Sequence, residues 1–236
     1  MTRVVLFGAT GMIGQGVLRE CLLDQGIASV TTVGRRTTWK TDAKLNDVVL
    51  KDPADIAKDA KLSSDLKQVD ACLYCLGTSA VGMGEREYTT ITKDMTLRVL
   101  DGCRAANPNM RFLFVSGNGS DAKSSNMWAR VKGETENEVL ARSPAPGSAV
   151  MFRPGLVEPV NGIRGEQSLL YKAVYACAPL LRGMGMPCTT TEALGRAMVA
   201  AAKLPAGAAA QAALGGKSIL ENGDINALAW GKPLPR

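Results

Sequence analysis

The chain of 236 residues contains no histidine. Histidine is the commonest general base and metal ligand, so any catalysis must use other groups. Aromatic residues make up only 5% of the chain, and its lysines and arginines are scattered. Because nucleic-acid-binding proteins concentrate basic side chains on one face and interleave aromatic ones, this composition argues against nucleic-acid binding.

Long apolar runs are also missing. No stretch of about 18 apolar residues occurs, so we expect no membrane-spanning segment and no membrane partner. A strand is expected from about residue 3, which leaves no room for a signal peptide. With 46% hydrophobic and 21% charged residues, residues 1–236 have the composition of a single globular domain. The formal net charge of +6 suits polyphosphate ligands, although a mildly basic surface is the plainer interpretation.

Cysteines are present but not in a pattern that indicates a metal site. Of the six, Cys72 and Cys75 have the Cys-x-x-Cys spacing, inside the apolar run 71–76. Residues three apart in a strand face opposite sides, so these thiols are poorly placed to share a metal ion or a disulfide. We interpret them as buried free thiols, which fits a reducing cytoplasm and predicts a cytoplasmic protein.

The first 22 residues combine a strand, a tight turn and the start of a helix. Residues 4–7 are apolar and half of them β-branched, which predicts a buried strand, and residues 13–22 have helical apolar spacing. Gly8 lets the chain leave the strand sharply, Gly11 lets a pyrophosphate approach the backbone, and Gly14 lets the helix pack closely. The helix N-terminus then faces the phosphates. This predicts a nucleotide site; a plain strand–helix turn is the alternative.

The second strand, at 29–33, ends in Gly34-Arg35-Arg36. In a dinucleotide-binding sheet this strand end faces the adenosine ribose, where an acidic residue would favour NAD. Two arginines suit a ribose 2′-phosphate instead, so Arg35 and Arg36 favour NADP as the cofactor. The alternative is a pair of solvated basic residues in a loop.

Further strands and crossover segments follow in alternation. Strands are expected at 45–50, 69–76, 111–116 and 148–153, and helices at 88–106 and 127–142. This alternation predicts an α/β fold with a doubly wound parallel sheet, helices on both faces and the strand order 3-2-1-4-5-6. Asp52 follows the third strand and is placed to meet the adenine amino group, or it forms a turn before Pro53. Gly77 follows the fourth strand and lets backbone approach a ligand.

Residues 156–236 are expected to form a small C-terminal, substrate-side part of the same domain. Helices are expected at 169–181 and 191–204 and a late strand at 217–220, while the Ala-rich stretch 206–213 is interpreted as a helix end or a loop. The apolar helix 169–181 fits a substrate pocket, the face of a homodimer or plain core, and the sequence does not separate these.

As a set, these motifs make the chain similar to the short-chain dehydrogenase/reductase superfamily, in its atypical, NADP-binding branch. It resembles the Tat-interacting-protein-like oxidoreductases, with NmrA-like and sugar-epimerase-like proteins as neighbours. The resemblance covers about residues 3 to 200 and is carried by the stretches Gly8 to Gly14, Arg35-Arg36, Cys75-Leu76-Gly77-Thr78, Ser116, Lys132-Gly133-Glu134 with Glu136 or Glu138, and Arg153-Pro154-Gly155.

The resemblance implies a Rossmann fold that binds NADP(H) and reduces an unknown small carbonyl substrate. The residues expected to contact the cofactor are Gly8, Thr10, Gly11, Met12, Ile13, Gly14, Arg35, Arg36, Asp52, Leu76, Gly77, Thr78, Ser116, Lys132, Pro154 and Leu156. No metal ion is expected.

One departure affects the expected chemistry. The family's active site is Tyr-x-x-x-Lys, in which the tyrosine handles the substrate proton and the lysine holds the nicotinamide ribose and lowers the tyrosine pKa. Here the tyrosine position holds Trp128, whose indole N–H is only a donor, while Lys132 is kept. Lys132, Ser116 and Trp128 are therefore the expected catalytic positions. Replacement proton donors are sought among Ser116, Ser120, Ser124 and Ser125, and among Tyr88, Tyr171 and Tyr175.

Two functions remain open. The first is an NADP(H)-dependent reductase, which relies on the cofactor motifs and Lys132. The second is a non-catalytic NADP(H)-binding redox sensor or regulatory protein, which relies on the inert ring of Trp128. A nucleotide-sugar epimerase is weaker, because the chain is short for the substrate domain and an epimerase needs the missing tyrosine.

Overall fold

A parallel sheet of seven strands organises the computed structural model, which describes all residues except 144, 165–182, 206 and 236. In sheet order the strands are β3 (Leu45–Val49), β2 (Ile27–Gly34), β1 (Thr2–Phe7), β4 (Ala71–Tyr74), β5 (Arg111–Val115), β6 (Ala149–Arg153) and β9 (Ile219–Glu221). Every pairing between neighbours is parallel. The carboxyl ends of the strands therefore share one edge of the sheet, where ligands bind in such folds.

The sequence of β1 shows why both faces of the sheet are covered. Val4 and Leu6 belong to one buried apolar cluster, and Val5 and Phe7 to the other. Because neighbouring residues of a strand point to opposite faces, an uninterrupted apolar run requires packing on both sides.

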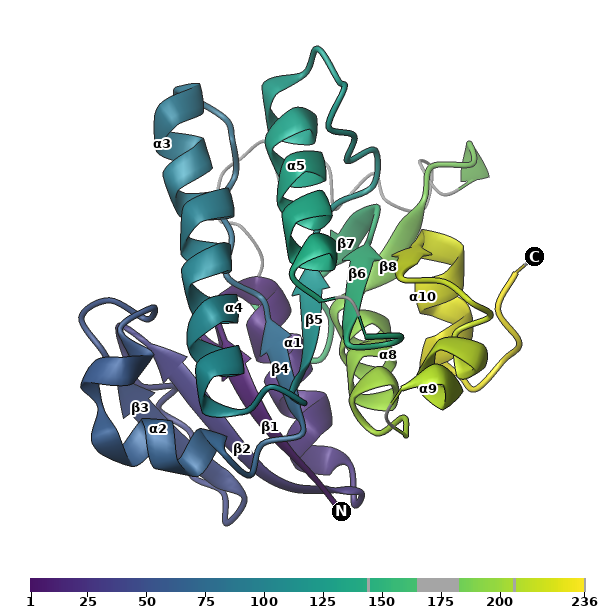
Figure 1. The fold of residues 1–236 in the computed structure, drawn as a ribbon. Helices are drawn as coiled ribbons and strands as arrows, with labels where there is room; N and C mark the ends of the chain where they lie inside the picture. The colour runs from purple at the N-terminus through teal and green to yellow at the C-terminus, as the bar shows by residue number, and fades with distance from the viewer. Residues whose placement is uncertain (144, 165–182, 206, 236) are drawn as a thin grey trace.

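Helices supply that packing in two layers (Figure 1). One layer holds α1 (Met12–Leu23), α8 (Thr191–Ala202), α9 (Ala208–Ala213) and α10 (Asn222–Ala229). The other holds the short η1 (Ile56–Lys58), α2 (Ala60–Leu66), α4 (Met95–Ala106) and α5 (Met127–Ala141). The π-helical turn η2 (Thr90–Asp94) joins α3 (Glu85–Thr89) to α4, so the helix expected from residue 88 begins at Glu85.

A second, two-stranded sheet lies beyond β6. It pairs β7 (Leu156–Glu158) with β8 (Cys188–Thr190). Thr190 caps the N-terminus of α8, since its hydroxyl accepts a hydrogen bond from the Ala193 N–H at 3.0 Å.

The expected fold class and strand order are confirmed, and the late strand β9 extends the sheet past β6. The Ala-rich stretch contains a short helix, α9. The apolar helix expected at 169–181 lies outside the described residues, so its assignment to a homodimer face stays a prediction. None of the helices in the described ranges is long and apolar enough to cross a membrane.

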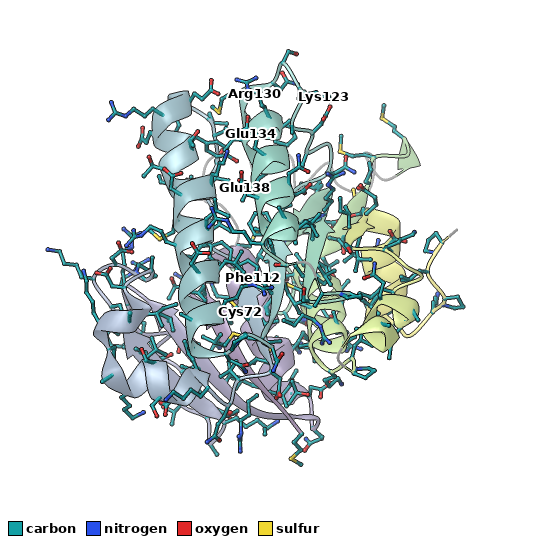
Figure 2. All side chains as sticks on the ribbon, viewed as in Figure 1. Cys72, Phe112, Lys123, Arg130, Glu134 and Glu138 are labelled. Carbon is teal, nitrogen blue, oxygen red and sulfur yellow. The ribbon has the colours of Figure 1, made fainter. Side chains whose placement is uncertain are left out.

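The interpretation of the Cys-x-x-Cys pair as free thiols is also confirmed, although Cys72 is buried and Cys75 only half-buried. Cys72 packs in the cluster beneath α4, beside Phe112 of the neighbouring strand (Figure 2), whereas Cys75 follows β4 and packs against the opposite cluster. Both are free thiols, and Cys177 lies outside the described part of the chain. No group of three or more cysteines and acidic residues is placed to hold a metal ion anywhere in that part.

Candidate functional site

The turn after β1 is built from glycines that the backbone itself requires. Gly8 has a φ of +83°, and a Cβ there would lie 2.7 Å from the carbonyl of Cys75. A Cβ on Gly14 would lie 2.0 Å from the Gly8 oxygen. Neither clash can be relieved by moving a side chain, so both positions are restricted to glycine by close packing of the turn, α1 and the end of β4.

Two other glycines leave space that the protein does not fill. Gly11 is the N-cap of α1, is exposed, and has no side chain capping the helix there. A Cβ on Gly77 would meet no atom of the described part of the chain within 4 Å, although its φ is not in the left-handed region. A helix N-terminus that no side chain caps, beside bare backbone, is a ready anion site, so this geometry fits a bound phosphate.

Three adjoining cavities follow the carboxyl edge of the sheet, and Leu76 lines all of them. The first, here the arginine cavity, is lined by Gly8, Ala9, Thr10, Thr32, Val33, Gly34, Arg35, Arg36, Pro53 and Leu76. The wide cavity, of about 780 Å³, is lined by Arg35, Lys51, Asp52, Pro53, Asp55, Lys58, Leu76, Gly77, Thr78, Ile91 and Met95. The lysine cavity is lined by Gly11, Met12, Ile13, Cys75, Leu76, Gly77, Thr78, Ser79, Val115, Ser116 and Lys132. The cavities thus bring together most of the residues expected to contact the cofactor.

Arg35 and Arg36 are exposed at the rim of the arginine cavity. Neither guanidinium forms a hydrogen bond or an ion pair with any residue in the described ranges, in contrast to Arg98 and Arg130, which pair with acidic side chains. The next residue, Thr37, has a buried hydroxyl that also lacks a hydrogen-bond partner there. Two unpaired cations beside an unsatisfied hydroxyl fit an anionic ligand group at this point.

Asp47 of β3 holds the loop that carries these arginines. Its carboxylate accepts hydrogen bonds from the Thr38 N–H and hydroxyl, both at 2.8 Å, and from the Thr32 hydroxyl. The contacts anchor the chain two residues after Arg36. The Asp47 carboxylate is therefore bonded to threonines and not to Arg35 or Arg36.

Asp52 serves the turn after β3. Its carboxylate accepts hydrogen bonds from the Ala54 N–H at 3.0 Å and from Arg98 at 2.8 Å, and together these hold its pKa below the ordinary value. The structure therefore shows the turn-forming role. The side chain also lines the wide cavity, and contact with an adenine stays a prediction.

Lys132 and Ser116 meet at the lysine cavity. Lys132 lies on α5, and its ammonium group lies 5.8 Å from the centre of the Phe114 ring. Burial lowers the pKa of Lys132 to about 8, although the charge of Glu136 acts in the opposite direction. Ser116 directly follows β5 and is buried, and its hydroxyl lies 3.0 Å from that of Ser120.

Trp128 does not line this cavity, although its ring and the Lys132 side chain both lie close to Gly117, where a Cβ would be 3.7 Å from the Lys132 Cδ. Its ring is within 3.9 Å of where a Cβ would lie on Gly117 and within 3.7 Å of the corresponding point on Gly119. The ring thus covers the loop after β5, is 37% exposed, and does not line the lysine cavity. The residue at the position equivalent to the family's tyrosine therefore packs on this loop, and a catalytic role for Trp128 stays a prediction.

The other proposed donors are placed less favourably. Ser124 and Ser125 lie in the turn before α5, where the Ser124 hydroxyl accepts the Asn126 N–H and the Ser125 carbonyl accepts Arg130, and neither lines the cavity. Tyr88 is fully buried in α3. Tyr171 and Tyr175 lie outside the described residues.

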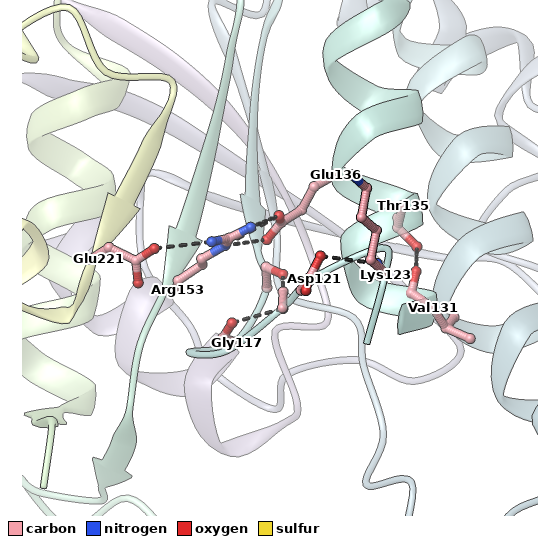
Figure 3. A network of polar contacts seen from close by, with 10 residues as sticks. Gly117, Asp121, Lys123, Val131, Thr135, Glu136, Arg153 and Glu221 are labelled. Atoms are coloured by element: carbon pink, nitrogen blue, oxygen red, sulfur yellow. Dashed lines mark hydrogen bonds and ion pairs between the residues drawn. The ribbon is translucent and has the colours of Figure 1, made fainter. Parts of the chain in front are cut away.

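A buried ionic network supports α5 from the side of the sheet (Figure 3). Arg153, at the end of β6, lies between Glu136 and Glu221 and donates to Glu136 at 2.9 and 2.5 Å and to Glu221 at 3.1 Å. Glu136 is 1% exposed, and its hydrogen bonds raise the pKa of Arg153. Of the two family glutamates considered, Glu136 is therefore the buried one; Glu138, on the flank of α5 in Figure 2, pairs with Arg142.

Pro154 and Leu156 do not line the lysine cavity. The Pro154 carbonyl accepts the Asn118 N–H at 2.9 Å, and the Leu156 N–H donates to Pro187 at 2.9 Å. A Cβ on Gly155 would lie 1.9 Å from the Pro187 oxygen, so packing of β7 against β8 explains the glycine of this motif. Contacts of Pro154 and Leu156 with a cofactor stay predictions.

Sequence patterns did not identify several residues of the site. Asp47 and Thr38 were missed, and so were the cavity-lining side chains of Lys51, Ile91 and Met95. Ile91 and Met95 have the apolar spacing of a core helix face, and that spacing does not distinguish a core position from a cavity wall. Asp47 lies on β3, next to the strand β2 that ends just before Arg35 and Arg36. This proximity could have singled out Asp47, but it is known only once the pairing of β2 with β3 is known.

Comparison with curated proteins finds relatives over about two thirds of the chain. The protein fmp52, mitochondrial, of Emericella nidulans is 31% identical over 163 residues, which cover 66% of this chain and 67% of that protein. The protein HTATIP2 of Rattus norvegicus is 29% identical over 155 residues, or 65% of this chain and 62% of that protein. These matches confirm the resemblance to the Tat-interacting-protein-like branch. The expectation of a cytoplasmic protein is wrong by the same comparison, because the fungal relatives are named mitochondrial.

Solved structures share the fold at low sequence identity. The Bordetella bronchiseptica enzyme WbmH in complex with NAD+ has a TM-score of 0.64 at 18% identity, over 94% of this chain and 75% of that one. MoeE5 in complex with UDP-glucuronic acid and NAD has a TM-score of 0.66 at 18% identity, over 98% and 84% of the two chains. Residues 4–142, which contain the glycine turn and Lys132, match the profile of one family. This chain belongs to the NAD dependent epimerase/dehydratase family.

Proposed function

We propose that this protein binds NADP(H) and reduces a small carbonyl compound. The observation that carries the cofactor part is the pair Arg35 and Arg36, unpaired in the described structure and exposed at the rim of the arginine cavity. In a dinucleotide-binding sheet the end of β2 meets the adenosine ribose. Two free guanidinium groups there favour a ribose carrying a 2′-phosphate over one with a free hydroxyl.

The rest of the site is consistent with a nicotinamide dinucleotide. WbmH and MoeE5, which share the fold, were each solved with NAD+ or NAD. In this chain the N-terminus of α1, which no side chain caps at Gly11, would hold the pyrophosphate, and Gly77 would let the ligand pass close to the backbone. The wide cavity, with the apolar side chains of Ile91 and Met95, would hold the adenine.

The chemistry would take place at the lysine cavity. A bound reduced dinucleotide supplies a hydride to a carbonyl carbon. The chain's own residues would orient the reactants: Lys132 would hold the nicotinamide ribose, and Ser116 would present its hydroxyl oxygen at the floor of the cavity. Ile13 and Val115 form an apolar part of the wall.

Two measurements on the purified protein test this function. Quenching of tryptophan emission during titration with NADPH and with NADH gives the two dissociation constants. Oxidation of NADPH, followed at 340 nm against a broad panel of aldehydes and ketones, gives turnover. We expect tight NADPH binding and oxidation with at least one carbonyl class. Tight binding with no turnover on any compound would contradict the reductase assignment.

That second outcome would favour a non-catalytic NADP(H)-binding redox sensor or regulatory protein. One observation supports this alternative: Trp128 replaces the usual acid and packs over Gly117 and Gly119 instead of lining the cavity. A sensor would show a change in stability or in partner binding between NADPH and NADP+ without consuming either nucleotide.

A further inference from the structure

Reduction of a carbonyl requires a proton donor, and the usual one is missing. The chain contains no histidine, and Trp128 neither ionises at neutral pH nor lines the lysine cavity. This question depends on the proposed reductase function, since without that reaction no donor is needed. In that reaction, a donor must be a side chain that lines the lysine cavity.

The Ser116 hydroxyl already donates its proton to the Ser120 hydroxyl. The Ser120 hydroxyl donates to the Gly117 carbonyl at 2.7 Å, which uses its single proton. In the 3.0 Å contact between the two serines, Ser116 must then be the donor and Ser120 the acceptor. Ser116 therefore offers the cavity an acceptor oxygen and no free proton.

Two titratable groups line the cavity among the described residues, Cys75 and Lys132. Burial raises the pKa of the Cys75 thiol well above its ordinary range, so it keeps its proton. Lys132 makes no hydrogen bond or ion pair within the described structure. Its ammonium group makes a cation–π contact with the Phe114 ring, 5.8 Å from the ring centre. Its three N–H groups are thus available to a molecule in the cavity.

We infer that Lys132 is itself the proton donor of the reaction, in the role that the family's tyrosine fills. As the carbonyl carbon gains the hydride, one N–H bond of the Lys132 ammonium breaks and an O–H bond forms on the substrate oxygen. The electron pair of the broken bond stays on nitrogen. The resulting neutral amine then takes a proton from water, which restores the starting state.

The electrostatic surroundings of Lys132 suit a side chain that must exist both as an ammonium group and as a neutral amine. Burial lowers the pKa of Lys132 to about 8, so loss of a proton is easier than from an exposed lysine. Glu136, one turn further along α5, opposes this shift but is neutralised by Arg153 of β6. From η2, Lys93 is paired with Glu134. Of the residues after β4 that line the cavity, Cys75 is the one with a titratable group, and its thiol is protonated.

The test combines one measurement without cofactor and one with it. In the dinucleotide-free protein, the pH dependence of amine labelling at Lys132, read by peptide mass spectrometry, should have its midpoint near 8. Lys61, whose ion pair with Asp65 raises its pKa, serves as the internal comparison. In turnover assays, Lys132→Arg keeps a positive charge for the ribose but does not release a proton at working pH. The exposed Lys123→Arg is the matched control.

We expect Lys132→Arg to bind NADPH within about threefold of the parent protein and to lose on the order of 10²–10⁴-fold in kcat. The parent kcat should fall above pH 8, and Lys123→Arg should behave like the parent. A labelling midpoint above 10, or turnover that survives Lys132→Arg with the same pH profile, would overturn this role alone. Absence of turnover by the parent protein that binds NADPH tightly would overturn the proposed function together with this role. Loss of turnover in Tyr171→Phe or Tyr175→Phe, with Lys132→Arg active, would identify a tyrosine as the donor instead.

Discussion

A substitution at Gly77 can test ligand binding without disturbing the stability of the fold. A methyl group there would meet no atom of the described residues within 4 Å, and Gly77 lines both the wide and the lysine cavity. We expect Gly77→Ala to leave the unfolding free energy nearly unchanged and to weaken dinucleotide binding roughly tenfold, or about 1.4 kcal/mol. Fluorescence titration and thermal melting measure the two quantities.

Gly84 provides the control for that variant. It also has open space around its Cβ position, but it caps α3 and lines none of the three cavities. Gly84→Ala should bind the dinucleotide like the parent protein. Equal losses of affinity in both variants would show that Gly77 acts on the fold and not on the ligand.

Lys132 gives a second prediction at this scale. Its pKa is lowered from 10.5 to about 8 in the folded state, so the unfolded chain binds more protons between these values, and stability rises with pH across that window. At pH 7 the buried charge costs stability, and Lys132→Met should stabilise the fold by about 1–3 kcal/mol while abolishing turnover. Melting temperatures from pH 7 to 10.5 test this: the advantage of the variant should shrink as pH rises, and a constant difference would be inconsistent with it.

At the scale of elements, the pairing of β2 with β3 positions the loop that carries Arg35 and Arg36. Asp47 holds Thr38 through two hydrogen bonds of 2.8 Å. Asp47→Ala should release this loop and weaken NADPH binding roughly tenfold while leaving NADH binding within about twofold. Paired calorimetric titrations decide the point, since equal weakening of both nucleotides would mean that Asp47 supports the sheet and not the arginines.

The network of Glu136, Arg153 and Glu221 links α5 to β6 and β9. Glu136→Gln leaves Arg153 without its buried partner, and we expect a loss of about 3–5 kcal/mol in unfolding free energy. Glu138→Gln, on the exposed flank of the same helix, should change it by no more than about 0.5 kcal/mol. Urea unfolding followed by circular dichroism compares the two, and similar small losses would show that the buried pair contributes little.

For the whole molecule, local patterns predicted the first strand, the glycine turn and the sheet order well. Each strand is a short apolar run between turn residues, and a run of this kind can be recognised from neighbouring residues alone. Interactions between distant segments were not predictable in this way. Arg153 and Glu136 are 17 residues apart, and Asp47 meets Thr38 only because the sheet brings their strands together. The place of Trp128 likewise depends on the loop at Gly117 and Gly119, which no periodicity describes.

The arrangement of the three cavities along one edge makes cofactor choice the central property of the molecule. A dinucleotide that lies across them would bring its adenosine end to Arg35 and Arg36 and its reactive end to Lys132. In the proposed function, reduction at the lysine cavity depends on this placement of the dinucleotide.

Calorimetric dissociation constants for NADPH and NADH, measured on the parent protein and on the double variant Arg35→Ser/Arg36→Ser, test this placement most directly. The parent protein should bind NADPH about 100-fold more tightly than NADH, a difference of about 2.7 kcal/mol. The double variant should lose most of that preference while its NADH affinity stays unchanged. Equal affinities in the parent protein, or a preference that survives removal of both arginines, would contradict the assignment of the 2′-phosphate to Arg35 and Arg36.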